Sequence, residues 1–384
     1  VDKLFLASSS TNPIITSSTS DQAIGNSNYS YQIETTQPAS SFTATGLPAG
    51  LSLNPGTGLI SGIPTEIGSF TVALSATEGG VTETSTLALV VSAALPGMTN
   101  AVGSDLSWGT SGDSNWFIQN AISRDGQAVQ SGNIGDLEAS SLFTRVEGPS
   151  DFIFYWKVSS EAQDDLIVFI DGVENSRISG IQDWARKNIL LGEGSHSVEF
   201  RYEKDLGTAE NADAGWIDSV EVIPFPSAVT GTSATDGDFD HFVTVTWTPP
   251  TESVDQYIIY RATVDDSGQA TEIGTSTLPE YGDSTAVRGT QYYYFVRAEN
   301  SAGLGPTDSG DDGFAAPDLP AASTQISATN ATLSDRVDIQ WNFVPGLVDL
   351  YTLYRTDNVN TPPTVLTTRS KTSNSFSDAT AIPG

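Results

Sequence analysis

The chain has 384 residues, no cysteine, and a formal net charge of −31 from 47 acidic and 16 basic residues. The length accommodates about two to four domains, and the absence of cysteine excludes a disulfide framework and thiol chemistry. The acidic surplus argues against nucleic acid or an anionic membrane surface as a partner. It favours solubility and the binding of hard cations such as Ca²⁺.

The local patterns predict strands throughout. No segment shows sustained helical periodicity, and 35 glycines and 19 prolines supply frequent turn signals. We therefore expect an all-β chain made of tandem β-sandwiches. No apolar run reaches the roughly 18 residues of a membrane span, so we expect no membrane insertion. The chain begins with valine instead of methionine, and we expect it to be either processed or an excerpt of a longer protein.

Residues 1–11 match a segment from the middle of the chain. The sequence VDKLFL at 1–6 aligns with IDSVEV at 217–222. We expect residues 1–11 to form a terminal strand, the tail of a preceding copy of the central module described below. A chance match is the alternative.

Residues 12–93 consist of short apolar segments bounded by glycine or proline. The motif GLPAGLSLNPGTGLISGIPT at 46–65 is followed by GSFTVALSA at 68–76. Gly58 and Gly62 lie where turns between short strands need a positive φ. These motifs resemble the He-PIG family of bacterial immunoglobulin-like domains, and the resemblance implies a spacer or interaction module without catalytic activity.

Residues 94–225 form the central module and contain the densest alternation of apolar and polar residues. Period-two alternation predicts strands with one buried face. We expect turns at Asp171-Gly172 and at Gly192–Gly194. The inward row is predicted to contain Phe152, Phe154, Trp156, Val198, Phe200 and Tyr202, whereas Ile153, Tyr155 and Lys157 point to the opposite face.

An ordered series of motifs in this module carries a second resemblance. It begins with FYWKVSSE at 154–161 and ends with DAGWID at 213–218. The series resembles the jelly-roll modules of bacterial secreted proteases and surface proteins, which are related to cleaved-adhesin and MAM-like domains. The resemblance implies two sheets packed face to face.

Acidic and amide side chains crowd the end of the central module. They are Asp205, Glu210, Asn211, Asp213 and Asp218. Because Ca²⁺ takes about six to eight oxygen ligands, such a loop predicts a structural calcium site with Asp218, Asp213 and Asp205 as ligands. The resemblance to jelly-roll modules implies the same ion, with Asp218 on the final strand as the first candidate. The alternative is a set of solvated carboxylates.

Residues 226–317 and 318–384 repeat one pattern. The first segment contains VTVTW at 243–247 and YIIYR at 257–261, and both segments place tryptophan thirteen positions before tyrosine. Together with YYYFVRAENSAG at 292–303, these motifs resemble fibronectin type III modules.

The second fibronectin-like copy is expected to lack its last two strands. In the first copy the strand YYYFVRAEN begins eleven positions after Tyr281, and Phe376 takes the place of Tyr281 in the second copy. The equivalent strand would therefore begin near position 387. Either the chain is a window on a longer polypeptide, or another subunit supplies the strands by β-strand addition.

We expect no catalytic activity. His196 and His241 lack the spacing of metal ligands, and no G-x-S-x-G nucleophile motif is present. Trp108, Trp116 and Trp184 are candidates for stacking on sugars, but filling the sandwich cores is the favoured interpretation.

The sequence favours a structural or adhesive module array of a secreted bacterial surface protein or extracellular filament. Its expected partners are other copies of itself or neighbouring subunits, with glycans or cell-surface components as further candidates. The alternative is a non-catalytic accessory region of a secreted hydrolase that binds carbohydrate or substrate.

Overall fold

The chain forms two compact units, Val1–Phe225 and Pro226–Gly384. Regular structure in the described residues is almost entirely β, which confirms the predicted fold class of tandem sandwiches. The α-helix found there is the short α1 (Met98–Val102). The predicted terminal strand at 1–11 lies outside the described residues. The computed structural model describes residues 13–207, 211–317, 320–330, 332–345, 348–358 and 360–381.

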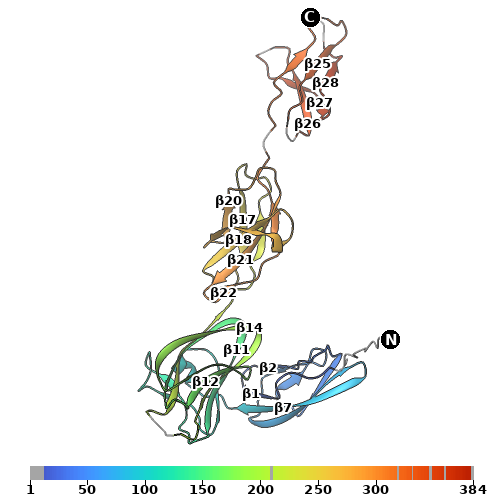
Figure 1. Ribbon diagram of the computed structural model, residues 1–384. Coiled ribbons are helices and arrows are strands. Elements are labelled where there is room, and N and C mark those ends of the chain that lie inside the picture. Colours follow the sequence, from blue (N-terminus) through green and yellow to red (C-terminus); the bar gives the residue numbers. More distant parts are fainter. Residues whose placement is uncertain are drawn as a thin grey trace, which may run out of the picture. The chain divides into compact units, whose positions relative to one another are not determined.

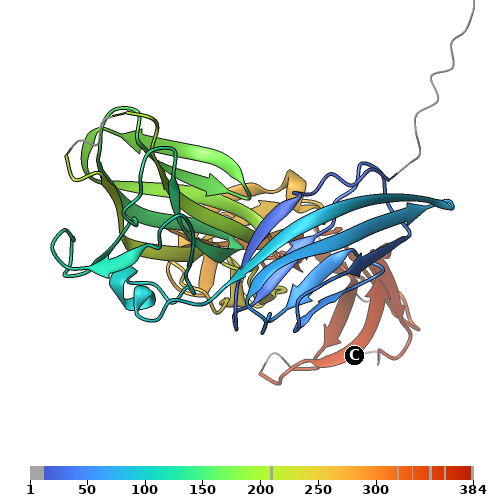
Figure 2. The same cartoon turned by 90° about the horizontal axis from the view of Figure 1, so that it is seen from below.

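The first sandwich of unit 1 has one sheet in the order β1-β7-β6-β3 and another in the order β2-β5-β4. The long hairpin of β6 and β7 lies at the centre of the larger sheet, in light blue in Figure 2. Gly62 has a φ of 140°, and a Cβ there would come within 2.1 Å of the Gly50 carbonyl oxygen, so this position requires glycine. The strands are β1 (Ser20–Ile24), β2 (Tyr29–Gln32), β3 (Ser41–Thr45), β4 (Leu51–Leu53), β5 (Leu59–Gly62), β6 (Gly68–Glu78) and β7 (Val81–Ser92).

The second sandwich of unit 1 follows α1 and is organised around two long strands, β11 and β14 (Figure 1). Its strands are β8 (Gly109–Gly112), β9 (Phe117–Gln119), β10 (Ala128–Gln130), β11 (Ala139–Ser159), β12 (Asp165–Ile170), β13 (Val173–Ser179), β14 (Ile181–Glu203) and β15 (Ala214–Pro224).

β11 and β14 belong to both layers of this sandwich. Residues 139–148 of β11 pair with β8 and with residues 194–203 of β14, which in turn pair with β12. Residues 150–159 of β11 pair with residues 181–191 of β14 and with β15. Each long strand therefore runs out of one layer and into the other.

The crossing point corrects one sequence prediction. Gly192–Gly194 is not a turn, because β14 continues through it opposite a register shift in β11 after Gly148. The two strands come so close here that a Cβ on Gly148 would lie 1.8 Å from the Gly192 carbonyl oxygen. Glycine thus serves close backbone approach at a bend. The other predicted turn, Asp171-Gly172, does join β12 to β13.

The predicted inward row of the central module is buried as a set. Phe152, Phe154 and Phe200 are 0% exposed, and the Phe154 and Phe200 rings from opposite layers lie 4.8 Å apart between centroids. The opposite row is less exposed than alternation predicts, since Ile153 is also buried. The segment before β10 covers this face, with the Arg124 guanidinium 3.3 Å from the centre of the Tyr155 ring.

A buried ion pair joins the two sandwiches of unit 1. The Arg145 guanidinium on β11 contacts the Asp21 carboxylate on β1, and each side chain is only 12% exposed. The Tyr29 hydroxyl donates to the same carboxylate at 3.0 Å, and Arg145 lies over the Tyr29 ring. Burial raises the pKa of Asp21, while the Arg145 charge and these hydrogen bonds act in the opposite direction.

Unit 2 begins with a sandwich whose smaller sheet has the order β16-β17-β20. Its larger sheet has the order β19-β18-β21-β22, with β23 paired to β21. Trp247 packs on Tyr257 between the sheets, at 5.0 Å between ring centroids. The strands are β16 (Thr230–Ala234), β17 (Val243–Thr248), β18 (Gln256–Ala262), β19 (Thr271–Ser276), β20 (Glu280–Asp283), β21 (Tyr292–Asn300), β22 (Gly303–Leu304) and β23 (Asp311–Gly313).

Residues 320–381 contain a smaller set of strands with the same order of motifs. One sheet is β24-β25-β28 and the other is the pair β26-β27. Among the described residues of this segment, Trp341 is the one large apolar side chain that is buried, at 5% exposed. The strands are β24 (Ile326–Ala328), β25 (Val337–Trp341), β26 (Leu350–Arg355), β27 (Thr364–Ser370) and β28 (Ser375–Asp378).

Candidate metal centre

Three carboxylates meet at one end of the central sandwich. Glu161 and Asp164 lie in the loop between β11 and β12, and Asp205 follows β14. Each offers one oxygen, and these oxygens lie within 4.8 Å of one another. The strand register explains the meeting, because the first residue of β12 pairs with the last residue of β14. The loops that flank these two strand ends are therefore neighbours.

Asp164 is the most enclosed member of this acidic centre. Its side chain is 1% exposed, and its Oδ1 accepts a hydrogen bond from the Asp205 amide at 3.0 Å. Its Oδ2 has no hydrogen-bond partner among the described residues. Burial raises the pKa of Asp164, the Asp205 amide and Lys204 oppose this, and Asp213 and Glu161 add to the rise. A buried carboxylate oxygen without a partner is costly, and a cation would remove that cost.

The backbone at Gly207 closes against the acidic centre. A Cβ at this position would lie 1.8 Å from Oε1 of Glu161 and 2.6 Å from Oδ1 of Asp205. The Gly207 amide donates to the same Asp205 oxygen at 2.5 Å. Only glycine fits here without moving the carboxylates. Glu210, which the sequence analysis grouped with these acids, lies outside the described residues.

Asp213 is engaged beside the acidic centre and is not a member of it. One of its oxygens accepts from the Tyr202 hydroxyl at 2.8 Å, and the other contacts the Lys204 ammonium. Burial lowers the pKa of Lys204, but the carboxylates of Asp213, Asp164 and Asp136 together outweigh this and leave that pKa raised. Both oxygens of Asp213 are thus committed to protein groups.

Asp218 has a different environment. It is fully buried on β15, where Oδ2 accepts from the Arg124 amide at 2.7 Å and Oδ1 from the Ser219 hydroxyl at 3.0 Å. Burial raises the pKa of Asp218, and these hydrogen bonds only partly oppose the rise. Of the three predicted ligands, the structure therefore groups only Asp205 with other carboxylates. Glu161 and Asp164 were missed, because they lie more than forty positions before Asp205 in the chain.

His196 has polar partners, and two of the candidate tryptophans fill the core. His196 Nδ1 lies 2.7 Å from Asp171 Oδ2 and its Nε2 lies 3.2 Å from the Gly192 carbonyl, a tertiary pair that spacing did not reveal. Trp108 and Trp116 are buried in the core of the central sandwich, and Trp184 is half-buried on β14.

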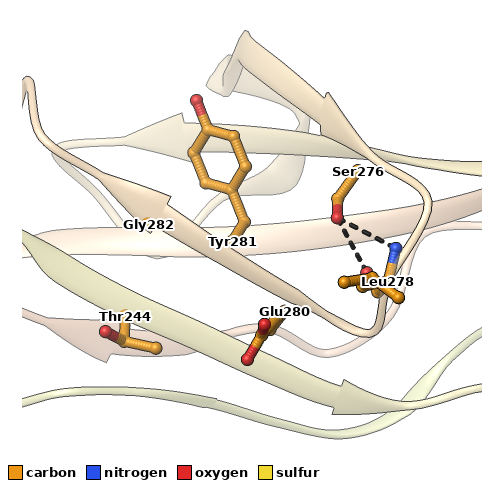
Figure 3. Close-up of a pocket in the computed structure, with 6 residues that line it drawn as sticks. All are labelled: Thr244, Ser276, Leu278, Glu280, Tyr281 and Gly282. Carbon is orange, nitrogen blue, oxygen red and sulfur yellow. Dashed lines mark hydrogen bonds between the residues drawn. The ribbon is translucent and has the colours of Figure 1, made fainter.

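Unit 2 has an open hollow of about 420 Å³ beside β20 (Figure 3). It is lined by Thr244, Ser276, Leu278, Glu280, Tyr281 and Gly282. The Ser276 hydroxyl is occupied by the turn that follows it, since it donates to the Leu278 carbonyl and accepts from the Leu278 amide. Glu280 is the acidic residue in this lining, so the hollow does not bring together acid and base groups.

The first sandwich has a recognised family. Residues 12–92 match the He_PIG family model, described as "Putative Ig domain". The match agrees with the resemblance predicted from the motifs at 46–76. No curated protein matches the chain.

Solved structures match parts of the chain. The secreted serine protease VesC from Vibrio cholerae is 13% identical with a TM-score of 0.33, and the match covers 56% of this chain and 51% of VesC. This chain thus spans about half the length of VesC. An Fn3-like protein from Clostridium thermocellum is 27% identical over 24% of this chain and 96% of its own, with a TM-score of 0.21. A human FNIII domain is 16% identical over 26% and 86%, with a TM-score of 0.22.

The chain is a multidomain protein of β-sandwiches, the first of which matches an immunoglobulin-like family. Among the described residues, no helix has the length and apolar character needed to cross a bilayer.

Proposed function

We propose that the chain is a structural and adhesive module array of a secreted bacterial surface protein or extracellular filament, without catalytic activity of its own. The observation that carries the proposal is the succession of separate hydrophobic cores, one of them in an Ig-like domain. Immunoglobulin-like domains are common outside cells, and the net charge of −31 favours solubility there. Other copies of the chain or neighbouring subunits are the proposed partners, with glycans or cell-surface components as further ones.

The connections within unit 1 support a stiff array. The Leu95 amide in the first linker donates to the Trp108 carbonyl at 3.0 Å, and the Arg145–Asp21 ion pair is buried between the sandwiches. Proline at 96 fixes φ in this linker and further restricts hinge motion. Stiff junctions suit a protein that holds a binding surface away from a cell.

Electron microscopy of the native material tests the proposed array. We expect a regular polymer whose repeat is about one chain long, because assembly by β-strand complementation joins each subunit to the next. Monomeric strings at all protein concentrations would contradict the filament and favour the accessory region of a hydrolase.

We further propose that Ca²⁺ occupies the acidic centre of Glu161, Asp164 and Asp205 and stiffens the central sandwich. The three carboxylates supply charge, and the unpartnered Oδ2 of Asp164 would become a ligand. This set differs from the ligands predicted from the sequence, which were Asp205, Asp213 and Asp218. Asp213 and Asp218 already accept hydrogen bonds from protein groups. The two sets are separable by substitution.

Calcium is expected to raise the melting temperature of unit 1. At a free concentration about a hundredfold above the Kd, binding adds about 2.7 kcal/mol, which corresponds to roughly 5–10 °C for a unit of this size. Asp164→Asn and Glu161→Gln are expected to abolish the response, and Asp218→Asn to retain it. Calorimetry in Ca²⁺ and in EDTA provides the measurement. Identical melting in both solutions would rule out the ion, and loss of the response in Asp218→Asn alone would return the site to the predicted set.

A further inference from the structure

Lys204 and Asp213 form an enclosed lysine–carboxylate pair in the central sandwich. Lys204 follows the end of β14, and Asp213 directly precedes β15. The Lys204 side chain is 5% exposed and that of Asp213 19%, and the ammonium contacts Asp213 Oδ2. In another lysine pair, Lys157 with Asp183 at 2.8 Å, the side chains are 21% and 88% exposed. Water therefore surrounds the carboxylate of the second pair but reaches little of the first.

The backbone holds both members of the enclosed pair in place. The Lys204 amide donates to the Glu138 carbonyl at 3.1 Å, so this residue stays tied to its neighbouring segment although β14 ends at Glu203. Asp213 has a φ of 52°, in the left-handed region that residues other than glycine adopt only uncommonly. Such a conformation persists where the surrounding structure imposes it, and it is often found at functional sites.

Tyr202 binds the second oxygen of the same carboxylate. Its side chain is 0% exposed, and its hydroxyl donates to Asp213 Oδ1 at 2.8 Å. A donor at this oxygen stabilises the negative charge that develops there when a nucleophile adds to the carboxyl carbon. The lysine nitrogen lies at the other oxygen, Oδ2. The nucleophile and the oxyanion donor are thus at different oxygens of one carboxylate.

Burial favours a neutral product over this ion pair. Removing two charges from water costs free energy that their mutual attraction offsets only in part, whereas an amide between Lys204 Nζ and Asp213 Cγ carries no charge. Groups that are already held in contact also need no further encounter in order to react. The buried Arg145–Asp21 pair lacks this outcome, because a guanidinium stays protonated in proteins.

We propose that Lys204 and Asp213 condense to an intramolecular isopeptide bond. Nζ gives one proton to Oδ2 and attacks Cγ, while the Tyr202 hydroxyl holds the negative charge on Oδ1. Nζ then gives a second proton to Oδ2, the Cγ–Oδ2 bond breaks, and this oxygen leaves as water. One hydrogen stays on the amide nitrogen, so the ammonium and the carboxylate become an amide and water with atoms and charge balanced.

The isopeptide bond joins the two layers of the central sandwich. Lys204 extends the half of β14 that pairs with β12, and Asp213 leads into β15, which pairs with residues 150–159 of β11 in the other layer. The bond therefore adds a covalent tie to layers that otherwise adhere through their hydrophobic core. This inference is independent of the proposed array and of the proposed calcium ion.

The intact mass of the full chain tests the bond. The folded chain is expected to be lighter than its sequence mass by one water molecule, and tandem mass spectrometry of a protease digest is expected to place the link between Lys204 and Asp213. Lys204→Arg keeps the positive charge without an amine nucleophile, and Asp213→Ala removes the carboxyl group, so both variants are expected to show the full mass. Lys157 in the solvated pair is expected to remain a free amine in the same digest.

The role of Tyr202 is measured by the rate of water loss after refolding from denaturant. Tyr202→Phe is expected to lose water about a hundredfold more slowly, because the donor to Oδ1 is missing. An equal rate would overturn the assignment of Tyr202 as the oxyanion donor.

The full sequence mass in the folded wild-type chain, after prolonged incubation, would overturn the proposal. A loss of water that persists in Lys204→Arg would do the same, because it would come from a cyclic imide at an aspartate. A digest that shows Lys204 as a free amine would lead to the same conclusion even if neither variant folds.

Discussion

Replacing Phe200 by alanine is expected to lower the free energy of unfolding of unit 1 by about 3–5 kcal/mol, the usual cost of emptying a large aromatic site in a core. Phe200 is 0% exposed, and its ring contacts Phe154 at 4.8 Å and Phe152 at 6.3 Å between centroids. These partners belong to the opposite layer of the sandwich. The cavity would therefore lie between the two layers, at the centre of the sandwich.

Chemical denaturation of the full chain measures this loss when the unfolding of unit 1 is monitored. Leu190→Ala on the same strand is the matched control, because Leu190 is 64% exposed and its removal leaves no cavity. We expect the control to change the free energy of unfolding by less than about 0.5 kcal/mol. Similar small effects of both substitutions would show that the Phe200 ring does not hold the layers together.

The Arg145→Met variant is expected to destabilise unit 1 by about 3–5 kcal/mol, because it leaves the Asp21 carboxylate buried without its counter-ion. Asp21 and Arg145 are each 12% exposed, so water cannot replace the lost charge. The methionine keeps apolar contact with the Tyr29 ring, which separates loss of charge from loss of packing.

Two controls accompany this variant in the same denaturation measurement. Arg177→Met removes an ion pair with Asp165 and Glu174 in which the arginine is 47% exposed, and we expect a loss of only about 0–1 kcal/mol. The double variant Asp21→Asn with Arg145→Met removes both charges and is expected to recover part of the stability. A loss for Arg145→Met no greater than for Arg177→Met would contradict a buried ionic junction between the sandwiches.

Local sequence pattern predicted the fold class and the buried row of the central module. Alternation at 152–156 and at 198–202 reports which side chains face the core, because strand geometry fixes the period. It did not predict that Ile153 is buried, since the covering segment comes from another part of the chain. It also predicted a turn at Gly192–Gly194 where the strand continues, because glycine in a bent strand and glycine in a turn look alike in sequence.

The acidic centre was predicted only in part. Asp205 was identified from the crowding of acids after β14, but Glu161 and Asp164 are more than forty positions earlier in the chain. They reach Asp205 only through the pairing of β12 with β14. Register between distant strands is a tertiary property, and a single sequence does not contain a local signal for it.

The sharing of β11 and β14 by both layers has a mechanical consequence for the central sandwich. A sheet that peels from its edge normally leaves the facing sheet with its strands still paired. Here, each layer contains half of β11 and half of β14, so the loss of one layer breaks two strands on which the other layer also depends. The layers should consequently come apart together, in one cooperative rupture, when the ends of the array are pulled.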